Sequence, residues 1–418
     1  MARWKIYTPE GVRDILFNEC YRKKELESRI RELFRRCGYS EVESPTLEFF
    51  DVFHEENLTP QEIMFKTIDQ QGRILVLRPD LTIPVARIAA TKCRDAALPL
   101  KFFYIGNSYN FSESGGGRLK EFTQAGIEIM GVNTAQADAE VIAMAINAVK
   151  ASGLEEFQIF VGQVDFFKGL MEDSGLSRDD MEMLKVLIES KDYVGIEELF
   201  KGYNIKKDLK ELVLNYYNFS GTPDEEIVRF EKIAKNERSK NALMNLRKVL
   251  EILDDYNMKK YVSVDLGILQ SMNYYTGIVF RGLTHGVGFP ILSGGRYDNL
   301  VKSFGRNLPA TGFALGINMV LTALERKSEA FVGQDDATLV SYGSHGRKIA
   351  FMICEELKKQ GLTVEIDITG YLPDKLEEYA KKRGIAGIVY VWDEDNIELC
   401  DMTNGSRRKT SFGELLKK

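Results

Sequence analysis

"YIGNSYNFSESGGGRLKEFTQAGIEIMG", residues 104–131, reads as two strand-like runs joined by a glycine-rich loop. The runs KFFYIGNSYNF and KEFTQAGIEIMG are rich in aromatic and β-branched residues, which favour strands. The segment therefore predicts an antiparallel hairpin with an extended connection. The GGG of 115–117 is followed by neither a helix nor a Lys-Ser/Thr pair, so we interpret it as a hairpin tip rather than a phosphate cradle.

Helix and strand patterns continue on both sides of this hairpin. Residues 24–37 have apolar side chains at helical spacing and stop at Gly38, and 135–152 read as an alanine-rich helix. After charged amphipathic helices over about 165–260, strand-like text returns at YVSVDLG, YYTGIVFRGL and FPILSGGRYDNL. The pattern predicts an α+β fold, in which an antiparallel sheet is flanked by helices and interrupted by a helical insertion.

The C-terminal part of the chain has a different pattern. SEAFVGQDD, residues 328–336, reads as a linker, and strand-like and helix-like runs alternate after it. That alternation is typical of a small α/β unit. We therefore predict a core domain at 1–327, a linker at 328–336 and an α/β domain at 337–418.

Composition and charge exclude several classes of protein. The 418 residues, 44% hydrophobic and 28% charged, fit a globular protein of two or three domains. A net charge of −6 argues against a dedicated nucleic-acid binder. The five scattered cysteines and three histidines show no metal or triad spacing, and no apolar run reaches the roughly 20 residues of a membrane span. We expect a cytoplasmic protein without a metal site or a cofactor.

Several motifs, in order along the chain, resemble the histidyl-tRNA synthetase lineage of class II aminoacyl-tRNA synthetases. TPEGVRDILF resembles the opening of that lineage, RPDLT its RPEGT segment, and QAGIEIMG the end of its motif 2. GGRYDNL and GFALGI resemble its histidine loop and motif 3. The resemblance covers nearly the whole chain. It implies a class II core followed by a domain like the anticodon-binding domain.

The chain departs from this lineage where amino-acid activation needs positive charge. Adenylate formation builds negative charge on the α-phosphate, which class II enzymes stabilise with guanidinium groups. By resemblance, YNFS at 109–112 replaces FRRE, GINM at 316–319 replaces GLER, and Gln270 replaces the arginine of RGLDYY. Losing one such donor typically costs about 2.7–4 kcal/mol of transition-state stabilisation. We therefore predict no catalytic residues, and we expect Arg118 to be the one guanidinium that remains near the loop.

Polar residues at positions that match the histidine contacts of the lineage are retained. By resemblance, the predicted histidine-binding residues are Asp80, Thr82, Arg118, Gln124, Glu128, Tyr274, Tyr275 and Tyr297. Carboxylates and phenols suit an imidazole and an amino group. The alternative is that these residues satisfy one another inside a sheet. GGRYD leaves a similar choice, between a binding role and a turn in which Arg296 pairs with Asp298.

A synthetase-like chain without these arginines resembles the ATP phosphoribosyltransferase regulatory subunits, and YYTGIVF, GGRYDNLVKSFG and PATGFALG fit that family closely. The resemblance implies assembly with a short-form ATP phosphoribosyltransferase catalytic subunit in the first step of histidine biosynthesis. It also implies a homodimer within that hetero-oligomer, through motif 1 around EVESPTLEFFDVF. A pocket that holds histidine without reacting can only bind it, so L-histidine is the expected feedback effector, through a coupling of about 1–3 kcal/mol. The sequence leaves open two places for it, the amino-acid pocket of the lineage and the interface between subunits.

Two other hypotheses stay open. The first is an active histidyl-tRNA synthetase with displaced arginines, which would catalyse histidine-dependent exchange between ATP and pyrophosphate. The second is a synthetase-like amino-acid sensor or tRNA-binding protein. Its association with tRNA would weaken steeply with salt.

Overall fold

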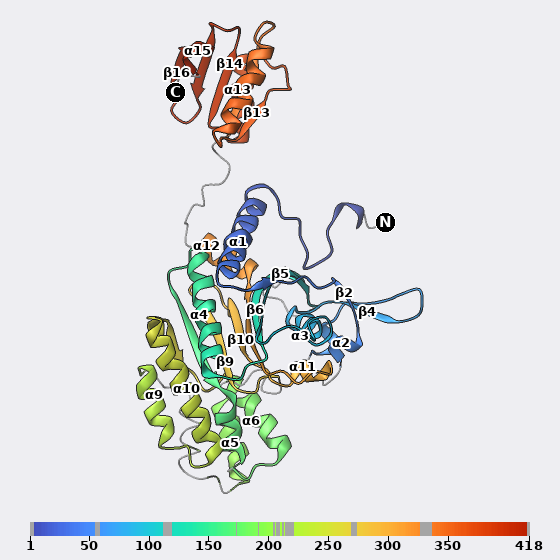
Figure 1. The fold of residues 1–418 in the computed structure, drawn as a ribbon, viewed down its shortest axis with the longest axis vertical. Coiled ribbons are helices and arrows are strands. Elements are labelled where there is room, and N and C mark those ends of the chain that lie inside the picture. The colour runs from blue at the N-terminus through green and yellow to red at the C-terminus, as the bar shows by residue number, and fades with distance from the viewer. Residues whose placement is uncertain are drawn as a thin grey trace. The chain divides into compact units, whose positions relative to one another are not determined.

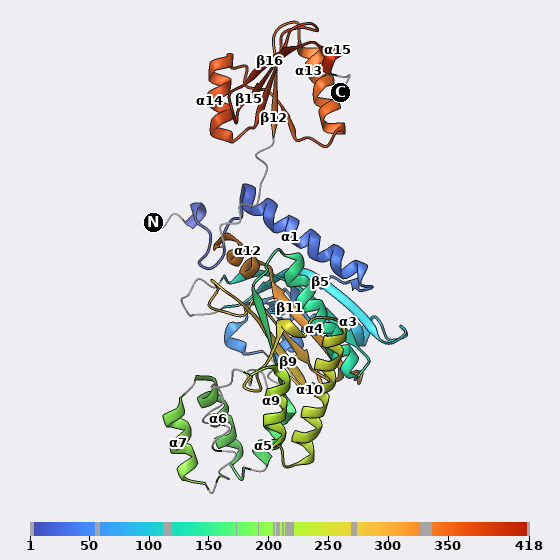
Figure 2. The ribbon, with the colours of Figure 1, turned by 90° about the vertical axis from the view of Figure 1, so that its left-hand side faces the viewer.

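The computed structural model of the chain describes residues 4–54, 59–111, 119–172, 174–190, 192–203, 205, 210, 213, 221–268, 274–326 and 337–415. The predicted linker at 328–336 lies outside these residues. The chain divides into two compact units, shown from two directions in Figure 1 and Figure 2. The larger unit comprises Met1–Ile15 and Lys23–Glu329, and the smaller comprises Leu16–Arg22 and Ala330–Lys418.

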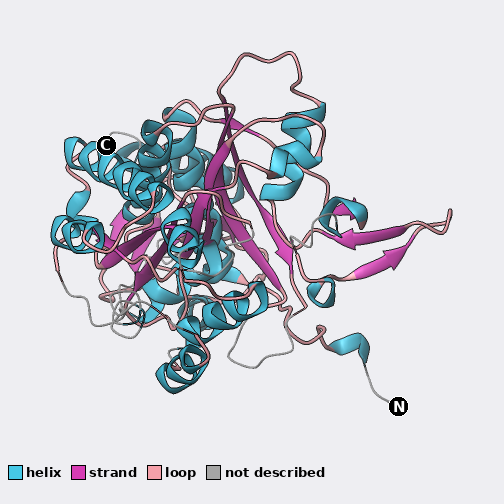
Figure 3. Ribbon diagram, turned by 90° about the horizontal axis from the view of Figure 1, so that it is seen from below, coloured by secondary structure: helices cyan, strands magenta, loops and turns pink. Residues whose placement is uncertain are grey.

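An eight-stranded sheet forms the centre of the larger unit. In spatial order its strands are β1 (Ser40–Glu41), β5 (Leu100–Tyr109), β6 (Glu121–Met130), β11 (Ala310–Gly316), β10 (Leu292–Arg296), β9 (Ile278–Thr284), β7 (Phe157–Gln163) and β8 (Val262–Val264). Neighbours from β5 through β7 pair antiparallel, whereas the terminal strands β1 and β8 lie parallel to β5 and β7. The predicted antiparallel sheet is confirmed, and Figure 3 shows its strands running between the helices.

The hairpin predicted from the opening stretch is formed by β5 and β6, which pair along their whole length from Leu100 opposite Met130 to Tyr109 opposite Glu121. The tip at 112–118 lies outside the described residues, and with it Arg118. Within the hairpin, a Cβ on Gly126 would lie 2.5 Å from the Tyr104 hydroxyl. Glycine at 126 therefore lets the Tyr104 phenol cross the neighbouring strand.

The larger unit also contains helices, some of which pack on this sheet while others form the insertion. In the described residues they are α1 (Phe17–Arg36), α2 (Asp51–His54), α3 (Thr82–Thr91), α4 (Ala135–Ala151), α5 (Val164–Glu172), α6 (Arg178–Ser190), α7 (Tyr193–Lys201), α9 (Pro223–Glu231), α10 (Glu237–Asp255), α11 (Leu300–Ser303) and α12 (Ile317–Arg326), with 3₁₀ turns η1 (Trp4–Ile6), η3 (Gln61–Ile63) and η4 (Lys259–Tyr261). The helix predicted at 24–37 is α1, which begins earlier than expected. Helices α5 to α10 follow β7 and precede β8, so the charged segment is a helical insertion between two strands of one sheet.

Side chains of β5 alternate between two helical layers. Phe103 packs against Phe34 of α1, with ring centroids 5.7 Å apart. Phe102 and Tyr104 instead belong to a buried cluster with the apolar face of α3. In the antiparallel register Phe102 lies opposite Glu128, so Glu128 shares the α3 face of the sheet with Tyr104. This alternation places a carboxylate in the core.

A three-stranded antiparallel sheet joins the segment before α2 to the segment before α3. Its spatial order is β2 (Leu47–Phe49), β4 (Ile74–Leu77) and β3 (Lys66–Ile68). Several of its apolar side chains are exposed: Leu47, Phe49, Ile68 and Ile74. The first two lie within the segment that the sequence analysis matched to motif 1.

The smaller unit is a mixed five-stranded sheet with helices on both faces. The strands in spatial order are β13 (Val364–Ile366), β12 (Thr338–Tyr342), β14 (Gly387–Val391), β15 (Ile397–Asp401) and β16 (Arg407–Thr410), and the helices are α13 (Arg347–Lys359), α14 (Pro373–Arg383) and α15 (Phe412–Leu415). Leu339 packs with α14 and Val340 with α13, so adjacent residues of β12 face opposite helices. Figure 2 shows α13 and α14 on the two sides of the strands.

The lengths and polarity of the described helices show whether any of them could cross a membrane. Within the described part of the chain, every helix is too short or too polar to span the hydrocarbon core of a bilayer.

Candidate ligand-binding site

Glu128 lies at the centre of a buried, hydrogen-bonded cluster on the α3 face of the sheet. Glu128 is only 1% exposed. The Tyr297 hydroxyl donates to Oε2, and the Tyr104 hydroxyl donates to Oε1 at 3.2 Å. Thr82 Oγ1 lies 3.3 Å from the Tyr104 hydroxyl. A Cβ on Gly312, in the neighbouring strand, would collide with Glu128 Oε2, so glycine is required there for the carboxylate to occupy its place.

Asp80 brings a second carboxylate to the same cluster. Its Oδ1 accepts a hydrogen bond of 3.0 Å from the Ile83 backbone N–H, in the first turn of α3. Burial raises the pKa of Asp80 to about 6, although hydrogen bonds from the backbone of Ile83 and Thr82 act in the opposite direction. Burial also raises the pKa of Glu128 to about 8, against the hydrogen bonds from its hydroxyl neighbours. Near neutral pH the free protein therefore holds Asp80 charged and Glu128 largely protonated.

Tyrosine rings form one side of this cluster. Tyr274 stacks on Tyr297, with ring centroids 5.3 Å apart and planes at 25°. Tyr275 meets Tyr274 edge to face, with centroids 5.0 Å apart. Burial raises the pKa of all three phenols, so they stay neutral. Ionisable carboxyls beside aromatic faces make an environment that suits a small cation carrying N–H donors.

The buried Glu128 predicts a pH dependence of stability. Because its pKa rises from an ordinary 4.5 to about 8, the folded chain binds more protons than the unfolded chain between these values. The free energy of unfolding is therefore expected to fall as the pH rises through this interval. Glu128→Gln should remove at least about 1.4 kcal/mol of that fall, the equivalent of one pKa unit. Urea unfolding of both proteins at pH 5 and pH 8 measures the effect, and identical changes in the two proteins would contradict it.

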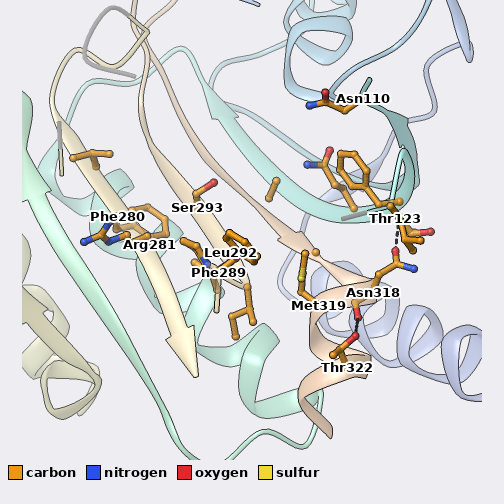
Figure 4. A pocket seen from close by; sticks show the side chains of 18 of the residues that line it. Asn110, Thr123, Phe280, Arg281, Phe289, Leu292, Ser293, Asn318, Met319 and Thr322 are labelled. Atoms are coloured by element: carbon orange, nitrogen blue, oxygen red, sulfur yellow. Dashed lines mark hydrogen bonds between the residues drawn. The ribbon is translucent and has the colours of Figure 1, made fainter. Parts of the chain in front are cut away.

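A pocket of about 480 Å³ opens on the same sheet, between β6, β9, β10, β11 and α12 (Figure 4). Most of its lining is apolar, including Phe122, Phe280, Phe289, Leu292 and Met319. Two residues predicted to bind histidine, Gln124 and Tyr275, also line it. The predicted residues thus fall into two groups. Asp80, Thr82, Glu128, Tyr274 and Tyr297 gather in the buried cluster, Gln124 and Tyr275 line the pocket, and Tyr275 joins the two groups through its contact with Tyr274.

Uncharged side chains occupy the described positions at which the resemblance expects guanidinium groups. Asn110 and Met319 line the pocket. Asn318, at the position of the glutamate in GLER, lines the pocket too, and its Oδ1 accepts a hydrogen bond of 2.7 Å from the Thr123 backbone N–H, drawn in Figure 4. Gln270 lies outside the described residues, as Arg118 does. The exchange of cations for the Asn110 amide and the Met319 thioether leaves little at these two positions to stabilise a phosphate.

Arg281 is a guanidinium that was not predicted from the sequence. Arg281 lies on β9 and its side chain lines the pocket (Figure 4). Its Nη2 donates to Asp265 Oδ2 at 3.0 Å, while its Nε is buried without a hydrogen-bond partner among the described residues. The available signal was a single cation in the otherwise apolar strand text YTGIVFRGL. Pairing with Asp265 offsets much of its charge.

In the described residues, no group of three or more His, Cys, Asp or Glu side chains is arranged to hold a metal ion.

Comparisons with known proteins agree on the relationship of this chain. The family model described as histidyl-tRNA synthetase matches residues 11–320. The ATP phosphoribosyltransferase regulatory subunit of Acetivibrio thermocellus is 60% identical over 418 residues, covering 100% of both chains. The regulatory subunit of Ruminiclostridium cellulolyticum is 52% identical over 417 residues, which cover 100% of this chain and 99% of that protein.

Solved structures give the same result for the fold. A crystal structure described as an ATP phosphoribosyltransferase regulatory subunit/histidyl-tRNA synthetase from Bacillus halodurans has a TM-score of 0.82 and 32% identity, covering 92% of this chain and 98% of that chain. Histidyl-tRNA synthetase from Nostoc sp. has a TM-score of 0.83 at 20% identity, covering 98% and 99%, and shares the fold. The predicted class II synthetase-like fold is confirmed. By sequence and by structure, this chain belongs to the family of ATP phosphoribosyltransferase regulatory subunits, which is built on the histidyl-tRNA synthetase fold.

Proposed function

We propose that this chain is the non-catalytic regulatory subunit of an ATP phosphoribosyltransferase, acting with a short-form catalytic subunit in the first step of histidine biosynthesis. L-Histidine is the proposed feedback effector. The proposal is supported mainly by one observation: among the described residues, the site keeps its ligand-binding groups but lacks the cations needed for catalysis. The buried cluster around Glu128 and Asp80 keeps groups that bind a cationic amino acid, whereas Asn110 and Met319 stand where the synthetase lineage has cations.

The cluster supports histidine as the ligand through its charge. A histidine has an ammonium group and an imidazole, both of which donate hydrogen bonds to carboxylates. Glu128 and Asp80 supply such acceptors, and Tyr275 and Gln124 supply polar groups at the neighbouring pocket wall. When a cation binds, it favours the ionised form of Glu128, so binding near neutral pH releases a proton. We propose all seven described residues, and Arg118 with them, as the histidine site.

Binding regulates the partner only if it shifts an equilibrium between two states of the complex. Histidine must bind one state more tightly than the other, and a coupling of about 1–3 kcal/mol corresponds to a roughly 5- to 150-fold change in affinity. The buried cluster suits this role because its carboxyl groups change charge with occupancy. When ligand binding ionises a carboxyl group inside the core, the relative free energies of two arrangements of α3 and β6 around it change.

Exposed apolar side chains of the three-stranded sheet support a homodimer within the hetero-oligomer. Leu47 and Phe49, on one face of this sheet, are each more than two-fifths exposed, and Ile68, on the other face, is 71% exposed. Exposed apolar side chains gathered on one small sheet are typical of a protein interface. The proposal further divides the chain into a core at 1–327 and an anticodon-binding-like α/β domain at 337–418. It also places the complex in the cytoplasm, because the free cysteines suit a reducing compartment.

Reconstitution tests the proposal. Adding this chain to a pure short-form catalytic subunit is expected to raise the rate of phosphoribosyl-ATP formation, and histidine is expected to lower the rate of the mixture. The coupling above sets the expected scale at roughly 5-fold or more. The catalytic subunit mixed with heat-unfolded chain is the control. A rate that is the same with folded and unfolded chain would reject the regulatory assignment.

The presence of Arg281 in the pocket lining favours an alternative function, that of an active histidyl-tRNA synthetase. Among the described residues that line the pocket it is the one cation. Its pairing with Asp265 at 3.0 Å argues against a free phosphate-binding role. Histidine-dependent exchange of pyrophosphate into ATP by the pure chain would establish the alternative.

A further inference from the structure

A second cavity, of about 230 Å³, lies in the smaller unit and takes no part in the site described above. Its lining comes from the carboxyl ends of three parallel strands. Ser341 and Tyr342 end β12, Asp367 follows the last residue of β13, and Trp392 follows the last residue of β14. The connections that leave β12 and β13 lead to α13 and α14 on opposite faces of the sheet. Ligands of open α/β sheets bind in the crevice that this arrangement creates.

A buried carboxylate forms the polar part of this cavity. Asp367 is 8% exposed. Its Oδ1 accepts hydrogen bonds from the backbone N–H and the hydroxyl of Thr369, at 2.8 and 2.7 Å, and its Oδ2 accepts one from Ser341 Oγ at 2.8 Å. A carboxylate has about four acceptor sites, so one remains on Oδ2. In the described part of the chain no cation pairs with Asp367, and the cavity lining contains no Lys, Arg or His.

Aromatic rings form the walls of the cavity. Tyr390 and Trp392 are nearly parallel, at 10°, with centroids 6.3 Å apart. A Cβ on Gly343 would lie 2.9 Å from Trp392 Cε3, so glycine lets the loop after β12 approach the indole closely. Tyr371 forms another wall, and the Lys375 ammonium lies over its ring, 4.5 Å from the centroid. That contact places a cation against one face of the Tyr371 ring.

We propose that this cavity binds a small organic cation of amino-acid size, with its charged nitrogen at Asp367 and its carbon body against Tyr371 and Trp392. Asp367 Oδ2 keeps one acceptor site free, and a ligand nitrogen that carries a positive charge would form a charge-assisted hydrogen bond there. The aromatic walls add attraction between the cation and the rings. The volume is below the roughly 300–1,000 Å³ of pockets for drug-sized ligands, which sets the size of the ligand.

Tryptophan fluorescence makes the cavity directly observable. The chain has two tryptophans, Trp4 and Trp392, so in a Trp4→Phe variant Trp392 is the sole reporter. This full-length variant is titrated with n-butylammonium, methylguanidinium and imidazolium, and with the neutral n-butanol. The expected result is a saturable change of Trp392 emission with at least one cation and none with n-butanol. An equal response to n-butanol, or no saturable response to any of the cations, would overturn the proposal.

Asp367→Asn in the same background tests the carboxylate. Asparagine keeps the size of the side chain and can still accept from Thr369, so the fold should persist, which circular dichroism checks. Cation affinity is expected to fall about tenfold or more, because a hydrogen bond to a charged group is lost. Glu355→Gln is the matched control, because it removes the charge of an exposed residue on α13, and it should leave the affinity unchanged. Unchanged affinity in Asp367→Asn would refute the proposal.

The same reporter separates a free ligand from a cation held by a partner protein. Titration with the short-form catalytic subunit alone is expected to leave Trp392 emission unchanged. A change with that subunit and none with the free cations would assign the cavity to a protein side chain and overturn the small-molecule proposal.

Discussion

Replacing Arg296 with methionine is expected to lower the free energy of unfolding by about 3–5 kcal/mol. The Arg296 side chain is 4% exposed and the Asp138 side chain 1%. Arg296 Nε donates to Asp138 Oδ1 at 3.0 Å, and Nη1 donates to Asp298 Oδ1 at 3.0 Å. Methionine roughly fills the volume but leaves the Asp138 carboxylate buried without its cation. Burial already raises the pKa of Asp138 despite the guanidinium beside it.

Urea unfolding of the wild type and Arg296→Met measures this loss. Arg35→Met is the matched control, because Arg35 pairs with Glu32 on the exposed surface of α1. Surface pairs contribute little, so its effect should stay within about 0.5 kcal/mol. The double variant Arg296→Met/Asp138→Leu is expected to recover part of the loss, since it removes the unpaired charge. Equal effects of Arg296→Met and Arg35→Met would show that the buried pair is not required for stability.

The Arg296 pair also illustrates what the sequence can and cannot predict. The pairing with Asp298 was one of two interpretations of GGRYD, because the two residues are neighbours in the chain, and the structure confirms it. Asp138 lies on α4, far away in sequence, and nothing local connects it to Arg296. Contacts of this kind depend on which helix covers which strand. Their prediction requires the tertiary fold.

Local patterns were sufficient for the elements that have strong periodicity. The hairpin of β5 and β6 follows from two strand-like runs around one loop, and the pairing confirms it. The start of α1 was placed too late because aromatic side chains near its beginning are exposed: Phe17 is 83% and Tyr21 47% accessible. A turn without a buried face has no apolar periodicity to detect.

The candidate site was predictable only in part, and mainly through the resemblance. Tyr104 was missed although it donates to Glu128, because the contact depends on the register that places both on one face of β5 and β6. Gly312 was missed for the same reason, since its lack of a side chain matters only beside Glu128 in the neighbouring strand. Arg281 enters the pocket through the pairing of β9 with β10. Registers between strands distant in sequence are not encoded in any short motif.

Replacing Glu128 with glutamine is expected to weaken histidine binding by about 10- to 100-fold. A hydrogen bond to a charged partner contributes about 1.5–3 kcal/mol, and the amide supplies no charge. The fold should tolerate the change near neutral pH, because glutamine resembles the protonated carboxyl that a pKa of about 8 implies for the free protein. Loss of affinity would then report on binding, and not on unfolding.

Titration calorimetry with L-histidine at pH 6.5 and pH 8 tests this in both proteins. The wild type is expected to bind more tightly at pH 8, since less work is needed to remove the proton from Glu128, and its proton release should be larger at pH 6.5. Glu128→Gln should lack this component of the pH dependence. Glu140→Gln is the matched control, because Glu140 lies on α4 and pairs with Lys101 of β5 rather than with the cluster. Wild-type affinity in Glu128→Gln would exclude Glu128 from the histidine site, because a carboxylate in contact with the bound cation cannot lose its charge without weakening the complex.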